Sequence, residues 1–144
     1  LDTAIRIIRH AGQLIQPFYA QDTADEQFGL AWKGVNDPVT AADKAANAYI
    51  VSALSAAFPE DGILAEESVD SPVRLKKKRL WCIDPLDGTK EFIAHNGEFC
   101  VMIGLAIDGE ARLGVLYQPV EERLYYGIVG GGAWKEEADG LHPL

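Results

Sequence analysis

The chain has 144 residues, a formal net charge of -9, 48% hydrophobic residues and 24% charged residues. This length suits one domain that buries roughly 70% of its unfolded surface without needing disulfides. The negative charge argues against non-specific binding of nucleic acid, and no apolar run is long enough to predict a transmembrane segment. The first residues also lack the apolar core of a secretory signal. We therefore expect a cytoplasmic protein, or one at the cytoplasmic face of the inner membrane if the source is bacterial.

The first third of the chain predicts two helices. Apolar residues recur at helical spacing over Leu1–Tyr19 and again over Ala41–Phe58. Pro17 is expected to end or kink the first helix. Thr40 can cap the second, because Asp43 follows three residues later in the spacing of a capping box.

The rest of the chain predicts strands. Asp108-Gly109 suits a type I′ turn and separates two apolar runs, so it is the strongest hairpin signal. A polar connector over residues 69–79 carries a run of basic residues that we interpret as a solvated loop. The expected strands are Ile63–Ala65, Leu80–Ile83, Phe99–Ile107, Ala111–Tyr117, Leu124–Val129 and Ala133–Lys135. Helices followed by antiparallel strands predict an α+β fold.

The most informative segment is Asp84-Pro85-Leu86-Asp87-Gly88-Thr89, directly after an apolar strand. Proline fixes its own φ and glycine permits backbone conformations closed to other residues, so a tight turn could hold both aspartates in one concave loop. Such a loop can bind a cation or a phosphate. The alternative is an ordinary turn, because Asp, Pro and Gly are common turn residues.

Further acidic residues lie where the expected elements begin or end, which are positions that sites favour. Magnesium needs only a few carboxylates from different segments, and Glu66, Asp84 and Asp87 would supply most of one site. The Leu86 carbonyl is another candidate ligand. The Asp-x-x-Asp spacing could serve two neighbouring metals.

A short helix is expected to begin at Gly88 and Thr89 and to run through Ile93. The backbone N–H groups at its start could face an anion. Metals and amides could then share one phosphate.

The cysteines and histidines suggest no chemistry of their own. Cys82 and Cys100 have no second Cys or His at metal-ligand spacing, so we interpret both as buried, reduced thiols. The histidines, His10, His95 and His142, each stand without a companion and receive no catalytic or metal role.

Three motifs in this order resemble the inositol monophosphatase superfamily of magnesium-dependent, lithium-sensitive sugar phosphatases. They are Asp37-Pro38-Val39-Thr40-Ala41-Ala42-Asp43, Glu66-Glu67-Ser68, and Trp81-Cys82-Ile83-Asp84-Pro85-Leu86-Asp87-Gly88-Thr89. Lys90-Glu91-Phe92, Asn96-Gly97-Glu98-Phe99 and the segment 132–137 are similar to the CysQ branch, which removes the 3′-phosphate of adenosine 3′,5′-bisphosphate in sulfur metabolism.

The resemblance implies the N-terminal part of a layered αβαβα fold, with two helices packed on a largely antiparallel sheet. Residues 1–144 would form the metal-binding α+β domain. A later Trp-Asp motif, whose aspartate completes the family's metal site, is not in this sequence. We therefore expect the C-terminal domain to lie outside this chain, and a monomer or homodimer.

The resemblance also implies roles for individual residues. Two or more Mg²⁺ ions would be held by Glu66, Asp84, the Leu86 carbonyl and Asp87, with Asp84 as the bridge. Asp43 and Thr89, acting with Glu66, would orient water and help to deprotonate it. The substrate phosphate would lie against the metals near Glu66, Leu86, Asp87, Gly88 and Thr89. Lys33 and Lys90 are either phosphate contacts or surface residues.

The predicted function is Mg²⁺-dependent hydrolysis of a small phosphomonoester, by 3′(2′),5′-bisphosphate nucleotidase chemistry in which two metals activate water. One alternative is an inositol monophosphatase. Another is a haloacid-dehalogenase-type phosphatase with Asp84 as covalent nucleophile, which the Asp-x-x-Asp spacing and the consecutive hairpins disfavour. From another class, the chain could be a non-catalytic cation-binding or regulatory module. We expect weak or no activity from the 144 residues alone.

Overall fold

The computed structural model describes residues 1–21, 29–34 and 37–144. Its helices are α1 (Asp2–Tyr19), α2 (Ala41–Ala57), α3 (Thr89–Ile93) and a short 3₁₀ helix at Pro72–Lys76. Its strands are β1 (Ala31–Gly34), β2 (Asp37–Val39), β3 (Gly62–Ala65), β4 (Arg79–Asp87), β5 (Cys100–Ile107), β6 (Glu110–Gln118), β7 (Arg123–Ile128), β8 (Gly132–Glu137) and β9 (Gly140–Pro143). None of the described helices is both long and apolar enough to span a membrane.

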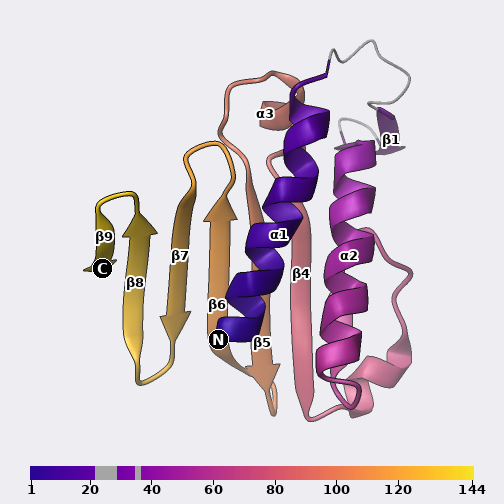
Figure 1. Ribbon diagram of the computed structural model, residues 1–144. Helices are drawn as coiled ribbons and strands as arrows, with labels where there is room; N and C mark the ends of the chain where they lie inside the picture. Colours follow the sequence, from indigo (N-terminus) through magenta and orange to yellow (C-terminus); the bar gives the residue numbers. More distant parts are fainter. Residues whose placement is uncertain (22–28, 35–36) are drawn as a thin grey trace.

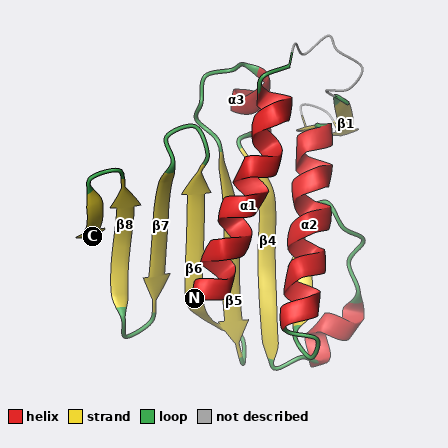
Figure 2. Ribbon diagram, viewed as in Figure 1, coloured by secondary structure: helices red, strands yellow, loops and turns green. Residues whose placement is uncertain are grey.

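The fold is α+β, as the sequence predicts. Strands β3 to β9 form one sheet in chain order, in which β3 pairs parallel with β4 and the other pairs are antiparallel. β1 and β2 form a separate two-stranded sheet. Helices α1 and α2 lie side by side on one face of the large sheet, over its β4–β6 region (Figure 1, Figure 2).

Both predicted long helices are confirmed within a residue of their bounds, but Pro17 lies inside α1 and does not end it. A proline in the last turn removes one backbone hydrogen bond and leaves the preceding turns intact. At α2, Thr40 is the N-cap residue of a capping box. The Asp43 carboxylate accepts the Thr40 backbone N–H at 2.7 Å and its hydroxyl at 2.6 Å.

The structure adds short elements that the sequence patterns missed. β1, β2, β9 and the 3₁₀ helix contain three to five residues each, too few for a repeated pattern of apolar positions. The Asp108-Gly109 turn is confirmed, since both residues have positive φ, 52° and 82°. This is the backbone conformation of a type I′ hairpin.

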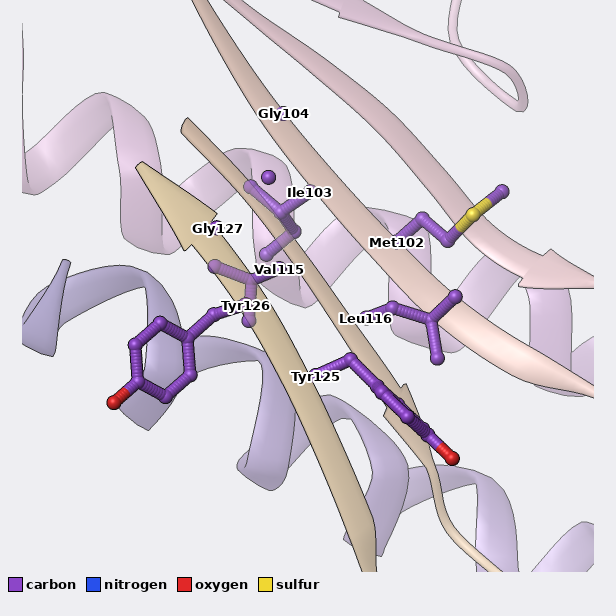
Figure 3. A pocket seen from close by; sticks show the side chains of 9 residues that line it. Met102, Ile103, Gly104, Val115, Leu116, Tyr125, Tyr126 and Gly127 are labelled. Atoms are coloured by element: carbon purple, nitrogen blue, oxygen red, sulfur yellow. The ribbon is translucent and has the colours of Figure 1, made fainter. Parts of the chain in front are cut away.

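The hydrophobic core lies between the two long helices and one face of the sheet. Strand alternation directs side chains such as Trp81, Ile103 and Leu124 toward the helices, where each is at most 2% exposed. The opposite face carries Met102, Leu116 and Tyr125, which project away from Ile103 and Val115 (Figure 3). A depression of about 320 Å³ lies among these residues.

Truncation of a core leucine tests this packing. Leu54 of α2 is fully buried, so we expect Leu54→Ala to lower the free energy of unfolding by about 2–5 kcal/mol, because it leaves a cavity. Leu75→Ala is the matched control, since Leu75 is 73% exposed and its loss should cost under about 0.5 kcal/mol. Urea denaturation measures both. Equal losses in the two variants would contradict the assigned core.

Candidate active site

The aspartate segment is a bulged strand end and not the turn that the sequence suggested. β4 continues through Asp87, pairing Asp84 with Met102 and Asp87 with Cys100 of β5, so β4 contains one extra residue. Pro85 and Leu86 are buried, and Asp84 Oδ1 accepts the Leu86 N–H at 3.2 Å. Because a bulge redirects side chains, Asp84 and Asp87 are not held to simple strand alternation.

Gly88 lies between the end of β4 and the start of α3. It has φ of 92°, and a Cβ at this position would lie 2.9 Å from the Glu98 carbonyl oxygen. Only glycine fits that conformation and that close approach. The short helix predicted to follow it is confirmed as α3, which starts at Thr89.

The parallel pairing of β3 and β4 brings Glu66 to the same sheet end as Asp84. Ala65 pairs with Ile83, and the next residue of each strand is an acid. The Glu66 N–H donates to the Ile83 carbonyl at 3.1 Å, which fixes the backbone there. Glu66 and Asp84 line one depression of about 520 Å³ on the open face of the sheet, together with Leu64, Cys82, Met102 and Gly104.

The clustered acids change the acidity of Asp84. Its burial, followed by the nearby charge of Glu66 and then that of Asp87, raises the pKa of Asp84 to about 7. Each of these effects penalises a negative charge at this position. A cation beside Asp84 would relieve this penalty.

Thr89 and Asp43 connect this strand end to helix α2. The Thr89 hydroxyl lies 3.0 Å from Asp43 Oδ1 and 3.2 Å from the Leu86 carbonyl oxygen. Because its single proton favours the charged acceptor, it donates to Asp43. Asp43 is 2% exposed, and its burial raises its pKa although hydrogen bonds from Thr40 and Thr89 act in the opposite direction.

The predictions for the other polar residues near the site have mixed outcomes. Cys100 is buried, with Sγ 3.9 Å from Asp87 Oδ2, but Cys82 is exposed, contrary to the prediction. The reason is alternation, which buries Trp81 and Ile83 and directs Cys82 to the open face. Lys90 is exposed, whereas Lys33 contacts the end of β3.

Glu66, Asp84 and Asp87 do not bring three ligand atoms within 4.8 Å of one another. Among the described residues, only Glu137, Asp139 and His142 bring three potential ligand atoms within 4.8 Å of one another. That group lies at the β8–β9 hairpin, where Glu137 pairs with Lys135 and Asp139 with His142. The sequence analysis did not identify this group, because it assigned no second metal-ligating residue to His142. The Glu137 carboxylate already has two basic partners, Arg123 and Lys135.

The sequence matches the model of the inositol monophosphatase family over residues 1–143, and the chain belongs to that family. It is 43% identical over 140 residues to the 3′(2′),5′-bisphosphate nucleotidase CysQ of Escherichia coli (strain K12). The aligned residues make up 95% of this chain and 54% of that protein.

Solved structures support the same relationship. The IMPase of Thermotoga maritima has a TM-score of 0.83 at 32% identity, covering 94% of this chain and 50% of that one. CysQ from Bacteroides thetaiotaomicron has a TM-score of 0.71 at 37% identity, covering 92% and 47%. This chain therefore spans about half the length of the proteins that it resembles.

Proposed function

We propose that the intact protein hydrolyses phosphomonoesters with the help of two Mg²⁺ ions, and that its substrate is adenosine 3′,5′-bisphosphate, from which it removes the 3′-phosphate. The observation that carries this proposal is the meeting of Glu66 and Asp84 at one sheet end, with the Thr89–Asp43 hydrogen bond nearby. The similarity to CysQ supports the choice of substrate.

The chemistry of the available donors fits magnesium. Glu66, Asp84, the Leu86 carbonyl and Asp87 offer oxygen atoms only, which suit a hard cation. Burial and the neighbouring acids Glu66 and Asp87 raise the pKa of Asp84, and a cation beside this carboxylate would offset both effects. When bound, two Mg²⁺ ions would neutralise the phosphate and lower the pKa of the attacking water.

Thr89 and Asp43 are proposed to handle the proton. A hydroxyl that donates to a carboxylate has its lone pairs free to accept from another donor. Thr89, donating to Asp43, can therefore accept a hydrogen bond from water and orient its oxygen toward phosphorus. Asp43 and Glu66 are the carboxylates proposed to help remove the proton.

The phosphate is proposed to lie beside Asp87, with the backbone N–H groups of Gly88 and Thr89 as donors to its oxygens. The left-handed backbone of Gly88 supports this part of the proposal, since it turns the chain at the point where β4 ends. Phosphoryl transfer depends mainly on positioning and charge stabilisation. The proposed residues would supply both.

Phosphate release by the intact protein tests the proposal. We expect Mg²⁺-dependent release from adenosine 3′,5′-bisphosphate to exceed release from inositol monophosphate and from phosphoadenosine phosphosulfate. Preference for inositol monophosphate would favour the family's other activity, for which the likeness to the Thermotoga IMPase is the supporting observation. Metal binding without turnover of any of the three would indicate the non-catalytic alternative.

The acidity of Asp84 leads to a pH-dependent stability. Its pKa in the folded chain, about 7, is higher than the 3.8 expected after unfolding, so the folded form holds the proton more tightly. The resulting stabilisation is present below about pH 4 and is lost as the pH rises through 7. In EDTA, we expect a lower free energy of unfolding at pH 8.0 than at pH 5.5, measured by urea denaturation.

Asp84→Asn tests whether Asp84 causes this pH dependence of the free energy of unfolding. It should reduce the difference between the two pH values, and the remainder should reflect Asp43, whose pKa is also raised by burial. An unchanged difference in Asp84→Asn would assign the effect to other groups.

A further inference from the structure

Lys33 stands at an irregular position in the β1–β2 sheet. Trp32 pairs with Pro38 and Gly34 pairs with Asp37, so two steps along β1 match one step along β2. Lys33 is therefore the extra residue of a bulge. Bulges redirect a side chain that regular pairing would point elsewhere.

The redirected side chain reaches the end of β3. Lys33 Nζ lies 2.8 Å from Glu66 Oε1 and 2.6 Å from Glu67 Oε1. The Glu67 side chain is 8% exposed and that of Glu66 is 47% exposed. One ammonium group thus bridges a buried carboxylate and an accessible one.

We propose that Lys33 is a built-in counter-ion of the metal site. Without metal, its ammonium group pairs with the Glu66 carboxylate. When metal binds to Glu66, the Lys33 side chain turns toward the substrate phosphate and keeps its ion pair with Glu67. This inference rests on the proposed function, because it needs Glu66 to be a metal ligand. Lys33 is a positioning residue with respect to the metal and a binding residue with respect to the phosphate.

The physical reason is a conflict of charges. A divalent ion on Glu66 would lie within a few ångströms of the ammonium at Oε1, where like charges repel strongly. Glu67 remains a buried partner that can keep the ammonium nearby. The bound phosphate then supplies negative charge for which the lysine is suited as a point-charge donor.

The two halves of the proposal predict opposite effects of one substitution. In the intact protein, Lys33→Gln should tighten Mg²⁺ binding about threefold to tenfold, measured by titration calorimetry without phosphate, because a repulsive charge is gone. The same variant should bind inorganic phosphate about tenfold more weakly in saturating Mg²⁺. Lys33→Arg, which keeps the charge, should retain wild-type-like values for both.

Lys78→Gln is the matched control. Lys78 is 73% exposed and pairs with Asp108 at 3.6 Å on the surface, so both affinities should stay at the wild-type values. Weaker Mg²⁺ binding by Lys33→Gln, or unchanged Mg²⁺ and phosphate affinities, would overturn the proposal. A merely structural role for Lys33 would weaken both affinities together.

The outcome also separates this inference from the proposed function. If the wild-type protein binds Mg²⁺ and Asp84→Asn does not, the metal assignment is supported. Unchanged Mg²⁺ and phosphate affinities in Lys33→Gln would then reject only the counter-ion role of Lys33. If Asp84→Asn and the wild type bind Mg²⁺ equally, the metal assignment itself fails and the Lys33 inference fails with it.

Discussion

Replacing Asp84 or Asp87 with asparagine is expected to reduce phosphate release from adenosine 3′,5′-bisphosphate by the intact protein on the order of 100-fold or more. Asparagine keeps the shape of the side chain but removes the charge that would hold the metals. Asp84 should have the larger effect, because the proposed bridge would serve both ions. Initial rates at saturating Mg²⁺ measure the loss.

Asp70→Asn is the matched control for these substitutions. Asp70 pairs with Arg74 in the exposed connector, and exposed ion pairs contribute little to stability. We expect an activity within about twofold of wild type. Wild-type rates in both Asp84→Asn and Asp87→Asn would refute the metal assignment.

The same variants distinguish two phosphatase mechanisms. In the proposed mechanism, water attacks phosphorus directly and no residue becomes phosphorylated. In a haloacid-dehalogenase-type enzyme, Asp84 would form an acyl phosphate that can be trapped during turnover. Recovery of phosphorylated Asp84 from quenched reactions would reject the direct attack of water.

Long elements with a repeated pattern could be predicted from the sequence. Helices α1 and α2 each present a buried stripe over more than three turns, so their type and bounds follow from apolar spacing. The capping box at Thr40 and the Asp108-Gly109 turn are local effects, set by side chains that bond within a few residues. Tertiary contacts were not needed to predict them.

The features that sequence could not provide depend on distant contacts. The β1–β2 pair has only a few residues, and the bulge that directs Lys33 exists only because of its pairing with Pro38 and Asp37. The exposure of Cys82 likewise depends on which face the helices cover. Residue types therefore identified candidate ligands, while the contacts of Lys33 needed the fold.

The aspartate segment illustrates both outcomes. Asp84 and Asp87 were singled out from their spacing, yet Pro85 and Leu86 suggested a turn where β4 continues as a bulged strand. Pairing with β5 explains the difference, since the β5 backbone offers partners that a local pattern does not reveal. The position at which the chain finally turns is Gly88, one residue later.

Gly88→Ala is therefore expected to damage both stability and metal binding. Alanine at φ of 92° is strained, and its Cβ would approach the backbone carbonyl of Glu98 to 2.9 Å. That neighbour is a main-chain atom of the segment leading into β5, so it cannot rotate away like a flexible side chain. Either Gly88 or the segment at Glu98 must shift, which would move Asp87 and Thr89.

Gly109→Ala separates strain from crowding. Gly109 also has a positive φ, of 82°, but a Cβ there would meet no atom within 4 Å. Its substitution should cost about 1–3 kcal/mol from backbone strain alone. Gly88→Ala should cost roughly 2 kcal/mol more by urea denaturation, because overpacking adds to the strain.

Mg²⁺ titration of the two glycine variants in the intact protein then tests the site. Binding should weaken about tenfold or more in Gly88→Ala and stay at the wild-type value in Gly109→Ala, since only the first displaces proposed ligands. If both variants lose stability equally and bind Mg²⁺ equally well, the close approach of Gly88 to Glu98 has no part in holding Asp87. Weakened binding in Gly88→Ala alone would link the geometry of this one backbone position to the metal site.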